Sequence, residues 1–243
     1  PQFDLTTGTD GNGKELTPSI KGNYNEWATA GFFGRVNYDY KGRYLAEFNM
    51  RYDGTSRFRR GSRWQASPSA SVGWNIANEE FWEPLSGTVN ALKLRFSYGE
   101  LGNQNTNSWY PTYRMMYLGA YDGGWMENLK KPNTALVGDL VSTSLTWETV
   151  RTWNIGLEFG LFNNRLTGSF DYYTRYTDNM VGPAPELPGI LGIKVPKTNN
   201  CDLKTTGWDL NINWRDRLNN GLGYGVGLVL SDAKTVIESY PGN

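Results

Sequence analysis

The sequence predicts an all-β fold whose long antiparallel strands run up and down through a membrane. The first observation behind this prediction is the stretch 146–180, in which two runs alternate residue by residue between an apolar and a polar face. The second is the length of these runs, since each is about twice the roughly 5–6 residues of a typical soluble strand. The third is that compact and long connections alternate along the chain, as they do in an up-and-down β-barrel.

The central hairpin has the dimensions and the two faces of a membrane-spanning pair. One face of each run is aliphatic and aromatic, as at Trp153 and Phe170, and the other is polar, as at Glu158 and Asp171. At ~3.3 Å per residue, a run of ten or more residues tilted by about 45° crosses the ~25 Å apolar band of an outer membrane. Adjacent asparagines in the turn 161–164 tolerate the left-handed conformations that tight hairpins need.

Composition agrees with strands that face lipid on one side only. Aromatic residues make up 14% of the 243 residues, yet the mean hydropathy is −0.57. No apolar segment approaches the roughly 18 residues that a membrane-spanning helix needs. In a membrane barrel, lipid-facing residues alternate with polar ones, which produces such an average. The formal net charge is zero, so it points neither to nucleic acid nor to an acidic partner.

Histidine is absent, which removes the commonest general base and the commonest transition-metal ligand, so we expect neither a metal nor another cofactor. The single cysteine, Cys201, falls in a predicted polar loop and cannot form an internal disulfide. It could be a reactive thiol, but an inert loop residue is the favoured interpretation. No leader precedes Pro1 and both ends resemble loop, which predicts an internal piece of a longer protein.

The N-terminal part predicts a loop followed by a long hairpin. Residues 1–26 are polar and Gly-rich, and we expect them to form an extracellular loop. The runs 32–40 and 43–53 then alternate in register around Lys41 and Gly42, which predicts two strands joined by a two-residue turn.

A cluster of four arginines occupies the connection 54–63. Guanidinium groups bind phosphate or sugar acids through bidentate contacts, so the cluster is a candidate anion site. A solvated loop is the favoured alternative. The four residues are Arg57, Arg59, Arg60 and Arg63.

Two further strands are predicted at 64–76 and 91–100. Pro68 is awkward in a paired central strand, so we expect a bulge or a local break in the ladder there. Between the two strands, Asn78 is expected to cap a short helix that Pro84 ends.

The rest of the chain alternates between irregular stretches and strands. Residues 101–145 are the least regular part, with one or two strands expected near 110–118. A Pro- and Gly-rich loop is expected at 181–204, followed by strands at 207–215 and 222–231. The alternation of compact and long connections predicts short turns at a periplasmic rim and long loops at an extracellular rim.

Short motifs occur in order along the chain, namely FGRVNY at 33–38, RYDG at 51–54, LRFSYG at 94–99, GNQ at 102–104, LTWE at 145–148 and GLFNNRL at 160–166. Together these motifs resemble the barrel of SusC/RagA-type TonB-dependent transporters. The resemblance covers residues 29–215, which is most of the chain.

This resemblance implies a 22-stranded barrel in the outer membrane of a Gram-negative bacterium, plugged by an N-terminal domain and driven by TonB with ExbB and ExbD. It also implies a SusD-like surface lipoprotein that covers the mouth and helps to capture a glycan or a peptide. No plug, TonB-contacting segment or terminal barrel strand is recognisable, so residues 1–243 are expected to supply about 8–10 strands of that barrel. The expected function is active import of an oligosaccharide or a peptide.

Two other functions are open from the sequence. A soluble secreted β-rich carbohydrate-binding protein would show the same alternation, with its apolar face buried between sheets. A passive porin would differ from a transporter only by lacking a plug. Enzymatic activity is not expected: Glu158 and Asp171 would face the lumen on neighbouring strands like a glycosidase pair, but lumen walls carry such pairs anyway.

Substrate contacts are expected in loops at the rim, because loops on a rigid scaffold often carry function. Amides and aromatic faces together suit a sugar or a peptide, although bracing of the loop is an equal alternative for Asn103 and Gln104. The candidate binding residues are Asn103, Gln104, Asn105, Trp109 and Tyr110. Charged residues of the polar face are expected to line the lumen and to form ladders across neighbouring strands. These residues are Arg35, Glu47, Arg51, Arg95, Glu158, Asp171 and Arg175.

Overall fold

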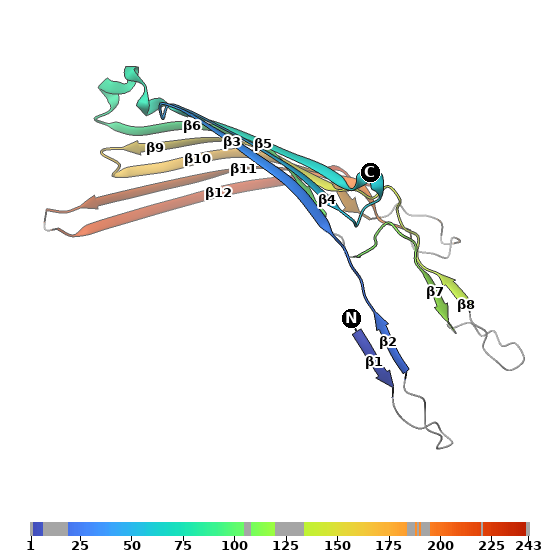
Figure 1. The fold of residues 1–243 in the computed structure, drawn as a ribbon. Helices are drawn as coiled ribbons and strands as arrows, with labels where there is room; N and C mark the ends of the chain where they lie inside the picture. The colour runs from blue at the N-terminus through green and yellow to red at the C-terminus, as the bar shows by residue number, and fades with distance from the viewer. Residues whose placement is uncertain are drawn as a thin grey trace, which may run out of the picture.

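A computed structural model describes residues 2–6, 19–104, 108–119, 134–183, 188, 190, 195–219 and 221–241. Its main body is one antiparallel sheet of eight strands, which arches as a single layer (Figure 1). In spatial order the strands are β12 (Gly223–Ser239), β11 (Thr198–Arg217), β10 (Leu166–Gly182), β9 (Glu148–Leu161), β6 (Val89–Asn103), β5 (Trp64–Asn75), β4 (Tyr44–Thr55) and β3 (Thr29–Tyr40). They contain 12 to 20 residues, which confirms the predicted long antiparallel strands.

Small hairpins and short 3-10 helices complete the described structure. β1 (Gln2–Thr6) pairs with β2 (Ser19–Asn23), and β7 (Met116–Gly119) pairs with β8 (Thr134–Val137). Both hairpins extend from the same end of the large sheet (Figure 1). The short helices are η1 (Arg60–Ser62), η2 (Ile76–Asn78) and η3 (Glu80–Leu85). Within the described part of the chain, no helix is long and apolar enough to cross a membrane.

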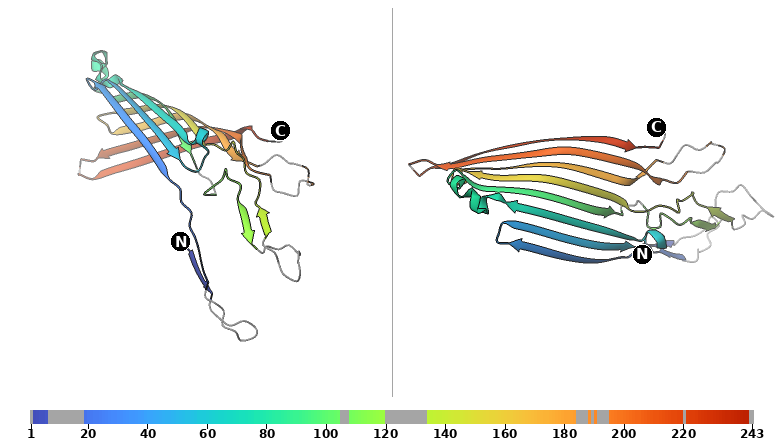
Figure 2. Two further views of the ribbon diagram at one scale, coloured as in Figure 1. Left: turned by 45° about the vertical axis from the view of Figure 1, so that its right-hand side comes forward. Right: turned by 90° about the horizontal axis from the view of Figure 1, so that it is seen from above.

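Compact and long connections lie at opposite ends of the large sheet (Figure 2). At one end, called the compact end, the strands are joined by residues 41–43, 76–88, 162–165 and 218–222. At the other, called the loop end, the connections are 56–63, 104–147 and 183–197. The predicted separation of short turns from long loops is therefore confirmed.

Backbone with positive φ closes two of the compact turns. Lys41 and Gly42 have φ values of 54° and 64°, as expected for a tight hairpin. In the central hairpin, Asn163 and Asn164 have φ values of 56° and 60°. Phe162 shares this conformation, with a φ of 56°, although its side chain does not favour it. The left-handed backbone of this turn therefore begins at Phe162, one residue before the two asparagines that predict the turn.

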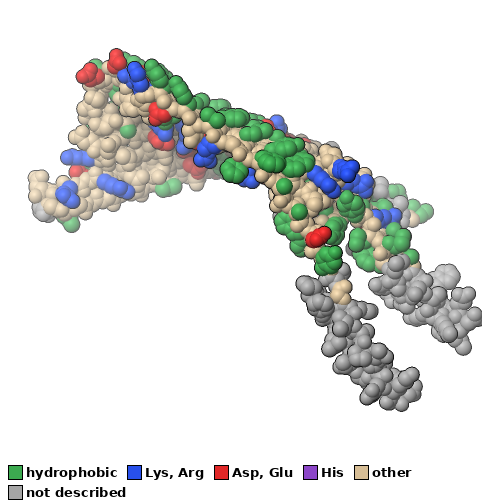
Figure 3. Space-filling view, viewed as in Figure 1, with side chains coloured by type: hydrophobic (Ala, Val, Ile, Leu, Met, Phe, Trp, Pro, Cys, Tyr) green, Lys and Arg blue, Asp and Glu red, His purple; other side chains and the backbone are tan. Residues whose placement is uncertain are grey.

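One face of the large sheet is apolar across neighbouring strands. The register pairs Phe96 of β6 with Val72 of β5 and with Ile155 of β9. It likewise pairs Phe170 of β10 with Leu210 of β11. Since side chains alternate between faces along a strand, this register collects the apolar residues on one surface. Hydrophobic side chains accordingly lie along the upper surface of the arch, and charged side chains lie beneath it (Figure 3).

Aromatic rings border the apolar face at both ends. At the compact end, the rings of Tyr44 and Trp74 stack with a centroid distance of 6.4 Å. At the loop end, Trp64 stacks on Tyr52 at 4.9 Å and on Phe32 at 6.3 Å. We call these two borders the compact-end girdle and the loop-end girdle. Such paired girdles are typical of barrels that cross a membrane.

The last two strands extend well beyond their predicted limits at the loop end. β11 begins at Thr198 instead of residue 207, and β12 ends at Ser239 instead of residue 231. The predicted loop 181–204 is correspondingly shorter. The sequence concealed this extension because residues 198–206 lie beyond the apolar face, where neither side of a strand needs apolar side chains.

Cys201 therefore lies in β11, and its predicted place in a loop is wrong. The residue is 7% exposed. Burial raises the pKa of the thiol, and the neighbouring Asp202 carboxylate raises it further. A protonated, buried thiol is a poor nucleophile, which favours the inert interpretation of this residue over the reactive one.

Pro68 interrupts the ladder on one side only. β5 pairs with β4 through Pro68 without a shift of register, whereas its pairing with β6 starts at Ser69. The predicted local break is thus confirmed, and it lies between β5 and β6. Beside the break, the Ser67 hydroxyl accepts a hydrogen bond of 3.3 Å from the Gly102 N–H, which replaces part of the lost ladder.

A small buried core lies at the loop end, near the break between β5 and β6. It consists of Phe58, Leu145 and Trp147, which are 1%, 6% and 4% exposed. The rings of Phe58 and Trp147 are 5.7 Å apart, and the Trp147 Nε1–H donates to the carbonyl of Arg63 at 3.3 Å. The core therefore ties the connection after β4 to the segment that leads into β9.

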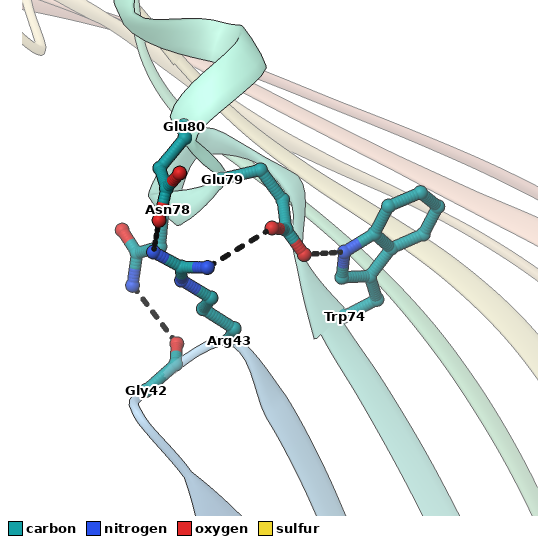
Figure 4. A network of polar contacts seen from close by, with 6 residues as sticks. All are labelled: Gly42, Arg43, Trp74, Asn78, Glu79 and Glu80. Carbon is teal, nitrogen blue, oxygen red and sulfur yellow. Dashed lines mark hydrogen bonds and ion pairs between the residues drawn. The ribbon is translucent and has the colours of Figure 1, made fainter.

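At the compact end, polar contacts clamp the connection 76–88 onto the β3–β4 turn (Figure 4). Arg43 donates to Glu79 at 3.5 Å and to Glu80 at 3.0 Å. Trp74 donates its Nε1–H to Glu79 at 3.0 Å. Hydrogen bonds from Tyr44 and Trp74 lower the pKa of the Glu79 carboxyl, and the charge of Arg43 lowers it further.

Asn78 takes part in this clamp, and its predicted role as a helix cap is wrong. Its side chain donates to the carbonyl of Gly42 at 2.8 Å. The residue before η3 is Glu79, which makes no side-chain capping bond. Pro84 lies inside η3 and does not end it, because a 3-10 turn this short loses little from one missing N–H.

We expect Glu79→Gln to reduce the acid sensitivity of the protein. The pKa of Glu79 is lower in the folded state, so its stabilising effect is full above the ordinary carboxyl pKa and is lost as the pH falls through the folded value. The variant should be less stable than the parent at neutral pH and should lose less stability on acidification. Thermal melting at a series of pH values measures this, with Glu83→Gln as the control; equal pH profiles for parent and Glu79→Gln would contradict the clamp.

We expect Trp147→Ala to lower the free energy of unfolding by about 3–5 kcal/mol, because it removes a buried ring and leaves a cavity. Trp109→Ala is the matched control, since Trp109 is 45% exposed and should cost much less. Unfolding of the full-length protein in detergent, followed by circular dichroism, measures both. Equal losses for the two variants would show that the small core does not stabilise the loop end.

Candidate functional site

Charged side chains on the polar face pair across neighbouring strands. Arg95 of β6 lies 2.6 Å from Asp171 of β10 and 3.6 Å from Glu158 of β9. The ion pair with Asp171 passes over Gly156, where a Cβ atom would come within 2.6 Å of the Asp171 carboxylate. Glycine at this position of β9 therefore lets the charges of β6 and β10 meet. Both carboxylates considered as a glycosidase pair contact the same arginine, as in a structural ladder.

Three more predicted wall residues, Arg35, Glu47 and Arg51, form ion pairs within the β3–β4 hairpin. Arg35 lies 3.9 Å from Glu47, and Arg51 lies 3.1 Å from Asp53. Arg175 lies on the same face of β10, two positions from Tyr173 and four from Asp171. All seven predicted wall residues thus share the polar face, and six of them form ion pairs. Their exposure to a lumen stays a prediction.

At the loop end, the segments 24–28, 56–63 and 108–115 meet around aromatic rings and arginines. We call the residues that join them the loop-end cluster: Trp27, Arg57, Arg59, Trp109, Tyr110 and Tyr113.

Arg57 is the centre of the loop-end cluster. Its guanidinium carbon lies 4.2 Å from the centroid of the Trp27 ring and 5.7 Å from that of Trp109. The two rings are themselves 6.2 Å apart. A cation over an aromatic face is stabilised by about 0.5–1 kcal/mol at exposed sites. One arginine therefore holds an aromatic residue from each of the other two segments.

Hydrogen bonds add a second set of links between the three segments. The Tyr110 hydroxyl donates to the carbonyl of Glu26 at 3.2 Å and accepts from the Glu26 N–H at 3.3 Å. The Ser56 N–H donates to the Ala28 carbonyl at 2.9 Å, and the Ala28 N–H donates to the Ser56 hydroxyl at 3.0 Å. The segment before β3 is thus fastened to both loops through its backbone.

Two of the other arginines in the 54–63 connection, Arg59 and Arg63, brace the loops. Arg59 donates to the carbonyl of Thr112 at 3.2 Å, and Arg63 donates through Nε to the carbonyl of Phe58 at 3.0 Å. Each guanidinium has further N–H groups beyond these bonds. The predicted anion site therefore stays a prediction, in a loop that is more ordered than the solvated alternative suggests.

A cavity of about 790 Å³ opens beside the loop-end cluster. Its lining includes Glu26, Trp27, Arg63, Tyr110, Tyr113 and Arg114. Trp27 and Tyr113 are 41% and 44% exposed, so parts of their rings are available to a ligand. Aromatic surfaces can stack on a flat ligand, and guanidinium groups can bind its oxygen atoms. This combination fits a sugar or a peptide better than a purely apolar molecule.

Two of the predicted binding residues, Trp109 and Tyr110, belong to the loop-end cluster. Trp27 and Tyr113 belong to it as well but were not predicted. Trp27 directly follows residues 1–26, the predicted extracellular loop, and only the fold brings it beside Trp109. The single local signal was the aromatic character of residues 109–121.

The binding role of the predicted amides Asn103, Gln104 and Asn105 stays a prediction. Asn103 donates to Glu148 at 2.8 Å, and the other carboxylate oxygen of Glu148 accepts from the Val181 N–H at 3.0 Å. Through Glu148, Asn103 is linked to β9 and β10, a contact that fits the bracing alternative without excluding substrate contact. Gln104 is half-buried next to this site, and Asn105 lies outside the described residues. In the described ranges, no group of three or more acidic or cysteine side chains could hold a metal ion.

Comparisons with known proteins agree with this geometry. A family model described as "TonB dependent receptor-like, beta-barrel" matches residues 2–243. The chain is 32% identical over 217 residues to TonB-dependent receptor P3 of Formosa agariphila. It is 34% identical over 188 residues to TonB-dependent receptor SusC of Bacteroides thetaiotaomicron. These alignments cover 89% and 75% of the chain but 21% and 18% of the relatives, so the chain spans about a fifth of their length.

Solved structures show the same arrangement of strands. The chain superposes on the RagAB peptide transporter with a TM-score of 0.78 and 26% identity, over 97% of this chain and 24% of that one. It superposes on the siderophore receptor PirA of Pseudomonas aeruginosa with a TM-score of 0.53 and 14% identity, over 90% of this chain and 37% of that one. The second likeness is one of fold alone.

We expect Tyr110→Phe to loosen the segment before β3. The substitution removes the hydroxyl that bonds both backbone groups of Glu26, which costs about 1 kcal/mol and speeds local opening roughly fivefold. Tyr113→Phe is the matched control, because the same atom is removed from a ring whose described contact is with Arg59. Amide hydrogen exchange at residues 24–28 measures the effect, and unchanged exchange in Tyr110→Phe would contradict the link.

Proposed function

This chain belongs to the TonB-dependent receptor β-barrel family, and we propose that it forms part of the wall and mouth of an outer-membrane importer for an oligosaccharide or a peptide. Members of this family are transporters. In this proposal residues 1–243 belong to the barrel domain, residues 1–26 lie at the extracellular mouth, and a SusD-like lipoprotein covers that mouth. Import would be driven by TonB with ExbB and ExbD acting on the whole protein.

One observation carries the proposal: an uncovered apolar face lies between two aromatic girdles and opposite a charged face. From Trp64 to Trp74 the strand β5 advances ten residues, or ~33 Å, which at a tilt of about 45° spans ~23 Å. This height matches the ~25 Å apolar band of an outer membrane. Phe48, Val72 and Phe96 within the band are 51%, 54% and 45% exposed, because no other described part of the protein covers them. Lipid-facing residues are expected to show such exposure.

The same observation argues against a soluble secreted binding protein. Such a protein would cover the apolar face with a second layer, since soluble proteins rarely expose an apolar patch of this extent. Among the described elements, the face of the eight-stranded sheet has no layer above it (Figures 1 and 2). A passive porin would have the same wall, and energy dependence separates it from an importer.

The orientation follows from the two ends of the sheet. In membrane barrels the short turns face the periplasm and the long loops face the exterior. The loop end, with its cluster and cavity, would then meet substrate first. Trp27, Trp109, Tyr113 and the free guanidinium edges of Arg63 and Arg114 would contact a sugar ring or a peptide. The related RagAB complex is a peptide transporter, which supports the peptide class. Aromatic rings beside guanidinium groups suit an oligosaccharide as well, so both ligand classes stay in the proposal.

The test follows the full-length protein in its source cells. We expect it only in detergent-extracted outer membrane, together with a lipoprotein, and we expect labelled oligosaccharides or peptides to enter only while the proton-motive force is intact. Recovery of the protein from the soluble fraction would replace the importer with the secreted binding protein. Uptake that continues after an uncoupler is added would indicate a porin.

Substrate contact at the loop end is tested separately with Trp27→Ala. Loss of one stacking ring should cost about 0.5–1.5 kcal/mol, which weakens binding roughly two- to tenfold. Phe81→Ala, at the compact end, is the matched control and should bind like the parent. Equal affinities for Trp27→Ala and the parent would place the binding site elsewhere in the transporter.

A further inference from the structure

The short helix η3 at the compact end is amphipathic. In a 3-10 helix, side chains three positions apart lie above one another. Glu80 and Glu83 therefore share one edge of η3, Trp82 and Leu85 share a second, and Phe81 and Pro84 share the third. One side of the helix is acidic and the other is apolar, within a connection of only thirteen residues.

Two apolar side chains of η3 are exposed. Phe81 is 62% exposed and Leu85 is 50% exposed. Trp82 follows Phe81 in the chain. Its ring lies 6.4 Å from that of Phe81, and its Nε1–H donates to the carbonyl of Val89 at 3.2 Å. The indole is thereby fixed, while Phe81 and Leu85 remain exposed.

The clamp fixes η3 on the apolar side of the sheet. Glu79, the residue before η3, accepts the indole N–H of Trp74, which belongs to the compact-end girdle on the apolar face. Glu80 is held by Arg43 in the β3–β4 turn, so the acidic edge faces that turn. The helix rises at the upper left of Figure 1, at the compact end, where acidic and basic side chains lie next to the end of the hydrophobic stretch in Figure 3.

We propose that η3 is an interfacial anchor, which inserts Phe81 and Leu85 into the phospholipid leaflet at the compact rim. The argument for lipid is continuity: the exposed side chains extend the apolar face past its girdle, and the clamp prevents them from turning away. Aromatic and aliphatic side chains on one side and carboxylates on the other suit a helix that lies in a membrane interface. The inference rests on the proposed function, because it requires lipid against the apolar face.

The experiment measures the surroundings of single labelled side chains in the full-length protein reconstituted into phospholipid vesicles. Nitroxide labels are attached to Phe81→Cys, Leu85→Cys and Glu83→Cys, in a background with Cys201→Ala. Phe48→Cys, in the middle of the apolar face of β4, is the lipid reference. Collisions of each label with oxygen, which concentrates in lipid, are compared with collisions with a water-soluble nickel chelate.

We expect the labels at 81 and 85 to favour oxygen over nickel several-fold more than the label at 83, and to resemble the label at 48. If 81 and 85 resemble 83 while 48 favours oxygen, the anchor is overturned and the barrel wall stands; a periplasmic protein partner would then be the occupant to seek. If 48 itself favours nickel, the lipid-facing wall fails and the anchor fails with it. Each label lies at an exposed position, so the heat-dependent gel mobility of a folded barrel should be unchanged.

Discussion

The hydrogen bonding of the backbone is the constraint on which the rest of this structure depends. Inside a bilayer no water is available to a free N–H or C=O, so a sheet that crosses it must pair every strand with its neighbours. Between the two edge strands, β3 and β12, the eight-stranded sheet has long, almost unbroken antiparallel registers. The clearest departure is at Pro68, and it lies toward the loop end, where the Ser67 hydroxyl and the core around Trp147 replace the missing ladder.

Beyond the apolar band, side-chain contacts hold the connections in place, where backbone hydrogen bonds between strands end. At the compact end, Arg43 and Glu79 hold a connection of thirteen residues against a tight turn and so keep η3 in one place. At the loop end, Arg57 and Tyr110 join three segments that are far apart in sequence. In the proposed transporter this difference would suit the two ends, one placing a rigid edge at the membrane and the other positioning loops that meet substrate.

The polar face shows how the same strands tolerate charge without a covering layer. Arg95 pairs with Glu158 and Asp171 across two strand boundaries, and Gly156 provides the room for it. Lys93, 4.0 Å from Glu158, supplies the second positive charge. Charges paired in this way remain compatible with a wet interior while adding cross-strand contacts. The wall is therefore polar and nearly neutral, which agrees with a formal net charge of zero for the whole chain.

The sequence by itself determined the strands, their faces and the separation of short turns from long loops, because period-two alternation is a local property imposed by lipid on one side and water on the other. The sequence-based prediction failed where the contrast between an apolar and a polar face ends. Residues 198–206 form part of β11 without an apolar face, and Cys201 was therefore predicted to lie in a loop. Only the tertiary structure decided the loop-end cluster, since Trp27, Arg57 and Trp109 approach one another through folding and carry no shared local pattern. It also decided the position of η3, which depends on a carboxylate meeting an indole and a guanidinium from two other parts of the chain.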